Sequence, residues 1–166
     1  MKNILYLLLA LASYGISAQT TAEEYLNSAV SKFYLDDMKG AIVDYTKAII
    51  IDPSYVEAYR KRGLAKETLK DYSGAIVDYT KAIEIDPNYA PAYRDRAIAK
   101  GKLKDHSGVV EDFTRAIEID PNYATAYFNR GVSKFYLGDM IGACKDARKA
   151  QELGDDASIL IKKACN

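Results

Sequence analysis

A proline recurs every 34 residues in this chain, at Pro53, Pro87 and Pro121, and it constrains the fold more than any other feature. Each proline lies in nearly the same segment, and the three segments are IIIDPSYVEAYRKRG, IEIDPNYAPAYRDRA and IEIDPNYATAYFNRG. A fixed period of this length indicates an array in which one small unit is stacked on the next, because such a unit buries its apolar face only against its neighbours. The sequence therefore predicts a repeat protein.

The first 18 residues have the layout of a secretory signal peptide. Lys2 precedes an apolar run from Ile4 to Ala12, and small or weakly polar residues lead to a cleavage point after Ala18. The apolar run is about half as long as the roughly 20 residues that cross a bilayer. We therefore expect export and exclude residues 1–18 from the fold; the alternative is an uncleaved N-terminal anchor.

The charge balance argues against a nucleic-acid partner. Lys and Arg together number 23, and Asp and Glu also number 23. A nucleic-acid-binding domain usually carries a basic stripe, and this sequence has none. No segment after the leader is apolar enough to cross a membrane, so we expect no membrane insertion after signal cleavage. The mature chain has the length of a single domain.

When Pro is placed at position 32, the chain divides into repeats 22–55, 56–89, 90–123 and a degenerate fourth, 124–157. Small residues recur at positions 8, 20 and 27, and large apolar residues recur at positions 4, 14 and 24. Within each repeat the apolar spacing of three and four residues is helical. Each repeat therefore predicts two helices with a turn near position 15 or 16, where an Asp caps the second helix: Asp37, Asp71, Asp105 and Asp139.

This pattern resembles the tetratricopeptide repeat. The segment with Ala58-Tyr59, Arg62-Gly63, Ala75-Ile76, Asp78-Tyr79, Ala82-Ile83 and Asp86-Pro87 matches that family almost throughout, and the likeness covers residues 22–157. The resemblance implies an all-α fold, an α-solenoid of four stacked helix-turn-helix repeats. In the family the helix pairs form a right-handed superhelix, and its inner face, mostly from the first helix of each repeat, binds other proteins.

The C-terminal end departs from the repeat pattern. The fourth repeat has Ala147 where an aromatic residue is expected, and its Asp-Pro is lost. Residues 157–166 carry an apolar stripe and predict a short capping helix, because a terminal repeat must cover its exposed face. The tail also resembles the ends of exported bacterial repeat proteins with a late Cys. That resemblance implies a disulfide between Cys144 and Cys165 that fastens the cap and has no redox role; the alternative is two buried thiols.

The expected recognition surface lies on positions 2, 5, 6, 9, 12 and 13 of each first helix. The predicted partner-binding residues are Leu26, Phe33, Tyr34, Arg60, Lys61, Leu64, Arg94, Ile98, Phe128, Asn129 and Phe135. They describe a groove with aromatic ends and a basic middle, suited to a partner segment with apolar anchors around an acidic centre. The alternative is that the aromatic side chains only pack between neighbouring helices. Family members that bind the acidic C-termini of heat-shock chaperones share a Lys at position 5 and an Asn at position 9, and this chain has neither.

No arrangement of residues predicts catalysis, a metal site or a cofactor. The single His, His106, falls in a predicted turn, and one His without placed carboxylates does not make a zinc site. Arg62, Arg96 and Arg130 at position 7 recur with an Asp at position 23, which favours buried ion pairs over an anion site. We therefore expect a non-enzymatic protein-protein interaction module, in the periplasm or at the cell surface of a bacterium, that binds a protein or peptide. The alternative is a structural spacer or assembly element of an envelope complex; the sequence permits a monomer but does not require one.

Overall fold

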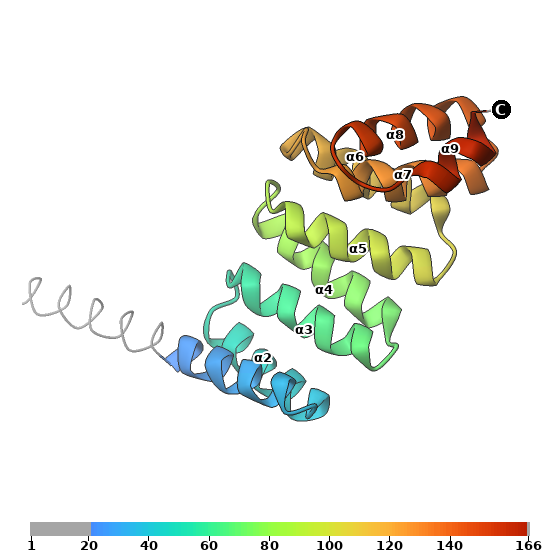
Figure 1. Ribbon diagram of the computed structural model, residues 1–166. Helices are drawn as coiled ribbons and strands as arrows, with labels where there is room; N and C mark the ends of the chain where they lie inside the picture. The colour runs from blue at the N-terminus through green and yellow to red at the C-terminus, as the bar shows by residue number, and fades with distance from the viewer. Residues whose placement is uncertain (1–20, 166) are drawn as a thin grey trace, which may run out of the picture. The chain divides into compact units, whose positions relative to one another are not determined.

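The computed structural model describes residues 21–165, which form consecutive α-helices joined by short turns (Figure 1). No strand occurs in this range, so the all-α prediction is confirmed. The predicted signal peptide lies outside the described residues. A helix over residues 21–34 is followed by α2 (Met38–Ile51), α3 (Val56–Thr68), α4 (Tyr72–Ile85), α5 (Ala90–Lys102), α6 (His106–Ile119), α7 (Ala124–Tyr136), α8 (Met140–Glu152) and α9 (Ser158–Ala164).

The chain divides into two compact bodies, one up to Asp71 and one from Tyr72 onward. The N-terminal body contains the helix over residues 21–34 together with α2 and α3. The C-terminal body contains α4 to α9. Among the described helices, none is both long and apolar enough to cross a bilayer.

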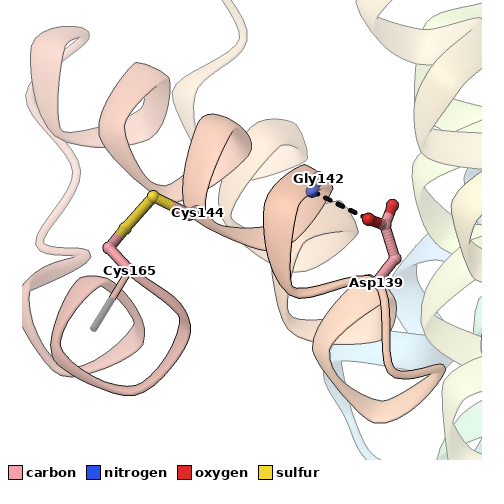
Figure 2. Close-up of a disulfide and its surroundings, with 4 residues drawn as sticks. All are labelled: Asp139, Gly142, Cys144 and Cys165. Carbon is pink, nitrogen blue, oxygen red and sulfur yellow. Dashed lines mark hydrogen bonds between the residues drawn. A yellow bond between two sulfur atoms is a disulfide. The ribbon is translucent and has the colours of Figure 1, made fainter.

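An Asp and a Gly together start the second helix of a repeat. The side chains of Asp37, Asp105 and Asp139 accept hydrogen bonds from the backbone N–H three residues later, at 2.8–2.9 Å. Figure 2 shows this bond from Gly142 to Asp139. A Cβ at Gly142 would lie 2.1 Å from Oδ2 of Asp139, so any other residue there would require the capping carboxylate to shift. The cap satisfies a backbone donor that has no partner within the helix.

The turn before each cap places position 15 in the left-handed backbone region. Asp36, Lys70 and Lys104 have φ of 62–64°, and Gly138 has φ of 83°. A left-handed residue at this point commonly ends an α-helix, and glycine adopts it with the least strain. Three of the four repeats therefore end their first helix with a residue that is not glycine.

Small and large residues interlock in the core of the C-terminal body. Ala97, Ala116 and Ala126 are fully buried, and Phe113 between them is 2% exposed. The small side chains let neighbouring helices approach closely, while the aromatic ring fills the space between them. This is the packing that the recurring small positions predict.

The carboxylates at position 23 are buried and paired with cations. Asp112 accepts two hydrogen bonds from Arg96, at 2.6 and 3.0 Å, and its Oδ2 lies 3.0 Å from Nζ of Lys100. Asp146 is bound in the same way by Arg130 and Lys134, with all three distances at 2.8 Å. These ion pairs are structural, which is the alternative that the fixed spacing of Arg and Asp in the sequence favoured over an anion site. The contribution of the lysines was not predicted from the sequence.

The first repeat has Ser28 in place of the arginine, and other donors serve its carboxylate. Asp44 accepts hydrogen bonds from Ser28 (2.7 Å), Lys32 (2.5 Å) and Lys47 (3.2 Å). Burial alone would raise the pKa of Asp44, but hydrogen bonds from Lys32, Ser28 and Lys47 outweigh burial and hold the pKa at about 2. The carboxylate is therefore ionised at any ordinary pH.

The position-7 arginines also reach the repeat before their own. Nη1 of Arg62, Arg96 and Arg130 donates to a threonine hydroxyl sixteen residues earlier, at 3.0–3.1 Å, and the acceptors are Thr46, Thr80 and Thr114. In the C-terminal body one guanidinium thus binds an Asp of its own repeat and a Thr of the preceding repeat. Because guanidinium geometry is planar and rigid, this arrangement fixes the register of adjacent repeats.

The last helix packs on α8 and α7 and is joined covalently to α8. Leu160 and Ala164 of α9 are buried against Ala143 and Ala147 of α8. A Cβ at Gly131 would lie 3.1 Å from a methyl carbon of Leu160, so the glycine permits this close approach. Cys144 and Cys165 form a disulfide at the end of α9 (Figure 2).

Candidate partner-binding site

The N-terminal body contains a pocket of about 180 Å³ between the helix over residues 21–34 and α3. Five of the predicted partner-binding residues line it: Phe33, Tyr34, Arg60, Lys61 and Leu64. Val30 and Tyr45 complete the lining. The residues come together because positions 5, 6, 9, 12 and 13 lie on one face of a helix, and the first helices of successive repeats present the same face.

This pocket combines aromatic surface with positive charge. Tyr34 is 82% exposed, and its ring meets Phe33 edge-on with 6.2 Å between centroids. Lys61 lies 3.4 Å from Glu57 on the exposed face of α3, a pair that solvent weakens. Burial, assisted by the carboxylate of Glu57, raises the pKa of Tyr45 to about 12. The hydroxyl of Tyr45 therefore keeps its proton and is able to donate a hydrogen bond.

Leu26 is not part of an accessible surface, which corrects the prediction from the sequence. Its side chain is only 6% exposed. Position 5 carries Arg60 and Arg94 in the next two repeats, and a long cationic side chain keeps its charged end near solvent while its stem is covered. A leucine at the same position has no such end and becomes part of the packing.

Arg94 is half-buried and already paired. Its guanidinium donates to Asp95 at 2.8 Å and lies within 2.7 Å of the same carboxylate through a second nitrogen. Burial alone would lower the pKa of Arg94, but hydrogen bonding to Asp95 raises it above its usual value. Asp95 is 2% exposed, so reversing the charge of Arg94 would place two carboxylates together in a buried position. Arg94 therefore has a structural role that the sequence analysis did not assign to it.

The C-terminal body has a pocket of about 280 Å³ bounded by α5, α6 and α7. Two predicted residues, Ile98 and Asn129, line it. The remaining lining residues are Ala97, Gly101, Lys102, His106, Val109, Phe113, Val132 and Ser133. Most of these are buried or half-buried apolar side chains, so the pocket opens directly onto the core of this body.

His106 belongs to this pocket, although the sequence analysis placed it in a turn. It is the first residue of α6, directly after the capping Asp105. Its ring stacks on Tyr136, with 4.7 Å between centroids and 15° between the planes. Its position in the repeat could have predicted this contact. The equivalent residues of the other repeats are Met38, Tyr72 and Met140, which are all large enough to contact a neighbouring helix.

The two predicted phenylalanines of the fourth repeat serve packing as well as surface. Phe128 and Phe135 are half-buried and contact the cluster formed by α8 and the cap, which includes Ala147 and Leu160. For these two residues the structure supports the packing alternative that the sequence left open.

A third pocket, of about 700 Å³, lies along α7 and α8 and contains none of the predicted partner-binding residues. Its acidic lining residues, Asp146 and Glu152, are paired with Arg130 and Lys149. Its other cations are Lys145 and Arg148, both exposed. Within residues 21–165 no group of three or more His, Cys, Asp and Glu side chains is placed to hold a metal ion.

Comparison with known proteins identifies one repeat of the chain. The family model described as the tetratricopeptide repeat matches residues 56–89, which are the second repeat as the 34-residue period defines it. The helix pairs and the solved structures below agree with that match. Residues 56–89 are a tetratricopeptide repeat. No curated protein matches the sequence.

Several solved tetratricopeptide-repeat structures resemble this protein. A crystal structure of MamA protein is 25% identical, with a TM-score of 0.82, over 87% of this chain and 80% of that one. The first repeat domain of Spaghetti (RPAP3), bound to the HSP90 peptide SRMEEVD, is 24% identical with a TM-score of 0.69, over 72% and 95% of the two chains. A tetratricopeptide repeat protein from Parabacteroides merdae ATCC 43184 is 17% identical with a TM-score of 0.79, over 88% and 58%.

Proposed function

We propose that this protein is a non-enzymatic binding module that holds an extended segment of a partner protein against the first helices of its repeats. In a family superhelix these helices form the inner, concave face. The proposal is supported chiefly by the pocket of the N-terminal body, where five residues chosen from their repeat positions line one cavity. A solved relative of the fold is bound to a peptide, which supports the same mode of use.

The lining of this pocket favours a particular partner chemistry. Phe33, Tyr34 and Leu64 offer apolar contact area, and aromatic side chains do so at a low entropic cost. Arg60 and Lys61 bring positive charge to the same cavity. The preferred segment therefore has an aromatic or aliphatic side chain next to a carboxylate. Because the helices are formed before binding, the ordering cost falls mainly on the partner.

Selection of peptides from a random phage-displayed library on the purified protein tests this function. We expect the enriched sequences to pair an apolar residue with Asp or Glu. Affinity is then measured by fluorescence anisotropy for the wild type, Lys61→Glu and Phe33→Ala, with thermal melts to verify folding. Each variant should weaken binding about tenfold, because charge complementarity or an anchor contact is lost.

Lys39→Glu is the matched control, because it makes the same charge change in the same body on the exposed surface of α2. It should leave the affinity unchanged. If no sequence is enriched, or if Lys61→Glu and Phe33→Ala bind an enriched peptide as tightly as the wild type does, the groove is not the binding surface. A role as a spacer or assembly element would then be favoured.

We also propose that the protein is exported, with cleavage after Ala18. The layout of residues 1–18 supports this, and the disulfide between Cys144 and Cys165 suits an oxidising compartment. Intact-mass analysis of protein from the periplasm of a bacterial host should give an N-terminus at Gln19 and two fewer hydrogens than the reduced chain. A variant with Leu8→Arg in the apolar run should remain unprocessed. Recovery of the wild type only in the cytosol, with its N-terminal segment intact, would contradict the proposal.

A further inference from the structure

The pocket of the C-terminal body exists because position 12 of the third repeat is a glycine. The first and fourth repeats have Phe33 and Phe135 at this position, and the third has Gly101. Packing does not require the glycine, because an added Cβ would meet only a methyl group of Val109, at an ordinary 3.7 Å. The effect of Gly101 is to leave open the space that a phenylalanine side chain would occupy.

The inner wall of this pocket is apolar except for one hydroxyl group. Ala97, Val109 and Phe113 are each at most 4% exposed. Ser133 is 5% exposed and lines the same pocket, and its hydroxyl forms no hydrogen bond with any residue in the range 21–165. No buried side-chain nitrogen or oxygen of the described residues lacks a hydrogen-bond partner, so this hydroxyl reaches the water of the pocket. A ligand that covers the hydroxyl must replace that hydrogen bond, because an unsatisfied polar group costs free energy.

Besides the exposed Lys102, two further polar groups line the pocket, and both are held in place. The imidazole of His106 is fixed by stacking on Tyr136, and within the described chain its ring nitrogens form no hydrogen bond. The amide nitrogen of Asn129 donates to the carbonyl of Thr125 at 2.8 Å, which leaves the amide oxygen as an acceptor. The pocket thus offers hydrogen-bond donors and acceptors beside a ring-sized apolar surface.

We propose that this pocket receives a tyrosine side chain of the bound partner segment. An aromatic ring fits against Val109 and Phe113, and a phenolic hydroxyl both donates and accepts, as the polar groups of the lining require. A volume of about 280 Å³ is large enough for an aromatic side chain. The inference rests on the proposed function, because the tyrosine belongs to the partner segment that the first helices bind.

Small aromatic probes test this pocket without any peptide. Binding of p-cresol, the side chain of tyrosine, and of toluene, the side chain of phenylalanine, is followed by NMR shifts of Ser133, His106 and Asn129. We expect p-cresol to bind roughly fivefold more tightly than toluene, because toluene leaves the Ser133 hydroxyl unpaired. Gly101→Ala should still bind p-cresol, whereas Gly101→Phe, which introduces the residue of the first and fourth repeats, should abolish the shifts.

Ser133→Ala is a second variant that leaves the pocket open and should remove the preference for p-cresol. Absence of p-cresol shifts in the wild type, equal shifts in Gly101→Phe, or equal affinity for toluene would overturn the assignment. These outcomes are distinguishable from failure of the proposed function, which is measured by peptide selection and by Lys61→Glu. If peptides bind through the N-terminal body but p-cresol does not bind here, only the tyrosine pocket is wrong.

Discussion

Asp146 carries more of the stability of this fold than its single charge suggests. It is 2% exposed and neutralises two cations, Arg130 and Lys134, that are themselves largely covered. In Asp146→Ala both cations lose their partner in a region of low polarity. We expect the free energy of unfolding in urea to fall by about 3 kcal/mol.

Glu152→Ala is the matched control for that substitution, because Glu152 is another carboxylate of α8. Its pair with Lys149 is exposed, so the loss should be below about 1 kcal/mol. Equal losses in the two variants would mean that burial of the pair has no energetic consequence.

The low pKa of Asp44 predicts a dependence of stability on acid. Its pKa is about 2 in the folded chain and has the usual value of 3.8 when exposed, so the folded state binds this proton less readily. The stabilisation is complete above about pH 3.8 and is lost as the pH falls toward 2. Urea unfolding between pH 5 and pH 2.5 should show a steeper loss for the wild type than for Asp44→Asn. Parallel curves would show that Asp44 does not contribute.

Single residues also mark the limit of what the sequence could predict about the site. Repeat positions identified Phe33, Lys61 and Leu64, because a helical face follows from spacing alone. They did not identify Leu26 as buried or Arg94 as paired, because those properties depend on the neighbouring side chains. Gly101 was not predicted as a site residue. It shapes the pocket because it has no side chain, and a search for residues that contact a partner does not find such a position.

At the scale of elements, the helices and their starts follow from local rules. The period of the apolar residues predicted two helices in each repeat, and Asp at position 16 predicted the cap that Asp37, Asp105 and Asp139 form. The left-handed residue at position 15 was not predicted. Two repeats carry Lys there, which gives no signal of a positive φ, and Asp36 gives only a weak one.

Lys104→Gly should therefore stabilise the protein. Lys104 has φ of 62°, a conformation that costs an L-residue about 1 kcal/mol and costs glycine little. Part of that gain is offset because glycine is more flexible when unfolded, so we expect a net increase of roughly 0.5 kcal/mol in the free energy of unfolding. Lys145→Gly, at an exposed helical position of α8, should instead lower stability by about 1 kcal/mol. A loss in both variants would argue against strain at position 15.

At the scale of the whole molecule, a repeat array transmits perturbations only to neighbouring repeats. The disulfide closes a segment of 21 residues, and a closure of this size stabilises by about 3 kcal/mol in the chain-entropy model. Helix α9 has seven residues and is too short to persist alone. Reduction should therefore loosen the cap and leave distant repeats folded.

Hydrogen exchange read by mass spectrometry checks this expectation. Reductant should speed exchange in peptides from α8 and α9 and leave peptides from α2 and α3 unchanged. The double variant Cys144→Ala/Cys165→Ala should behave as the reduced wild type and show no response to reductant. Faster exchange throughout residues 21–71 on reduction would mean that the chain opens as one cooperative unit.

The arginine that binds an Asp of its own repeat and a Thr of the preceding one has an evolutionary consequence. Each of these segments of 34 residues contains the Arg that donates to the preceding repeat and the Thr that accepts from the following repeat. An in-frame duplication or deletion of one segment therefore creates the same Arg–Thr contact between the repeats that become neighbours. Array length is thus free to vary through recombination without compensating mutations. The fourth repeat ends this freedom, because it has Arg148 where Thr46, Thr80 and Thr114 stand. A further copy placed after it would bring two guanidinium groups together, so Arg148 disfavours extension of the array at this point.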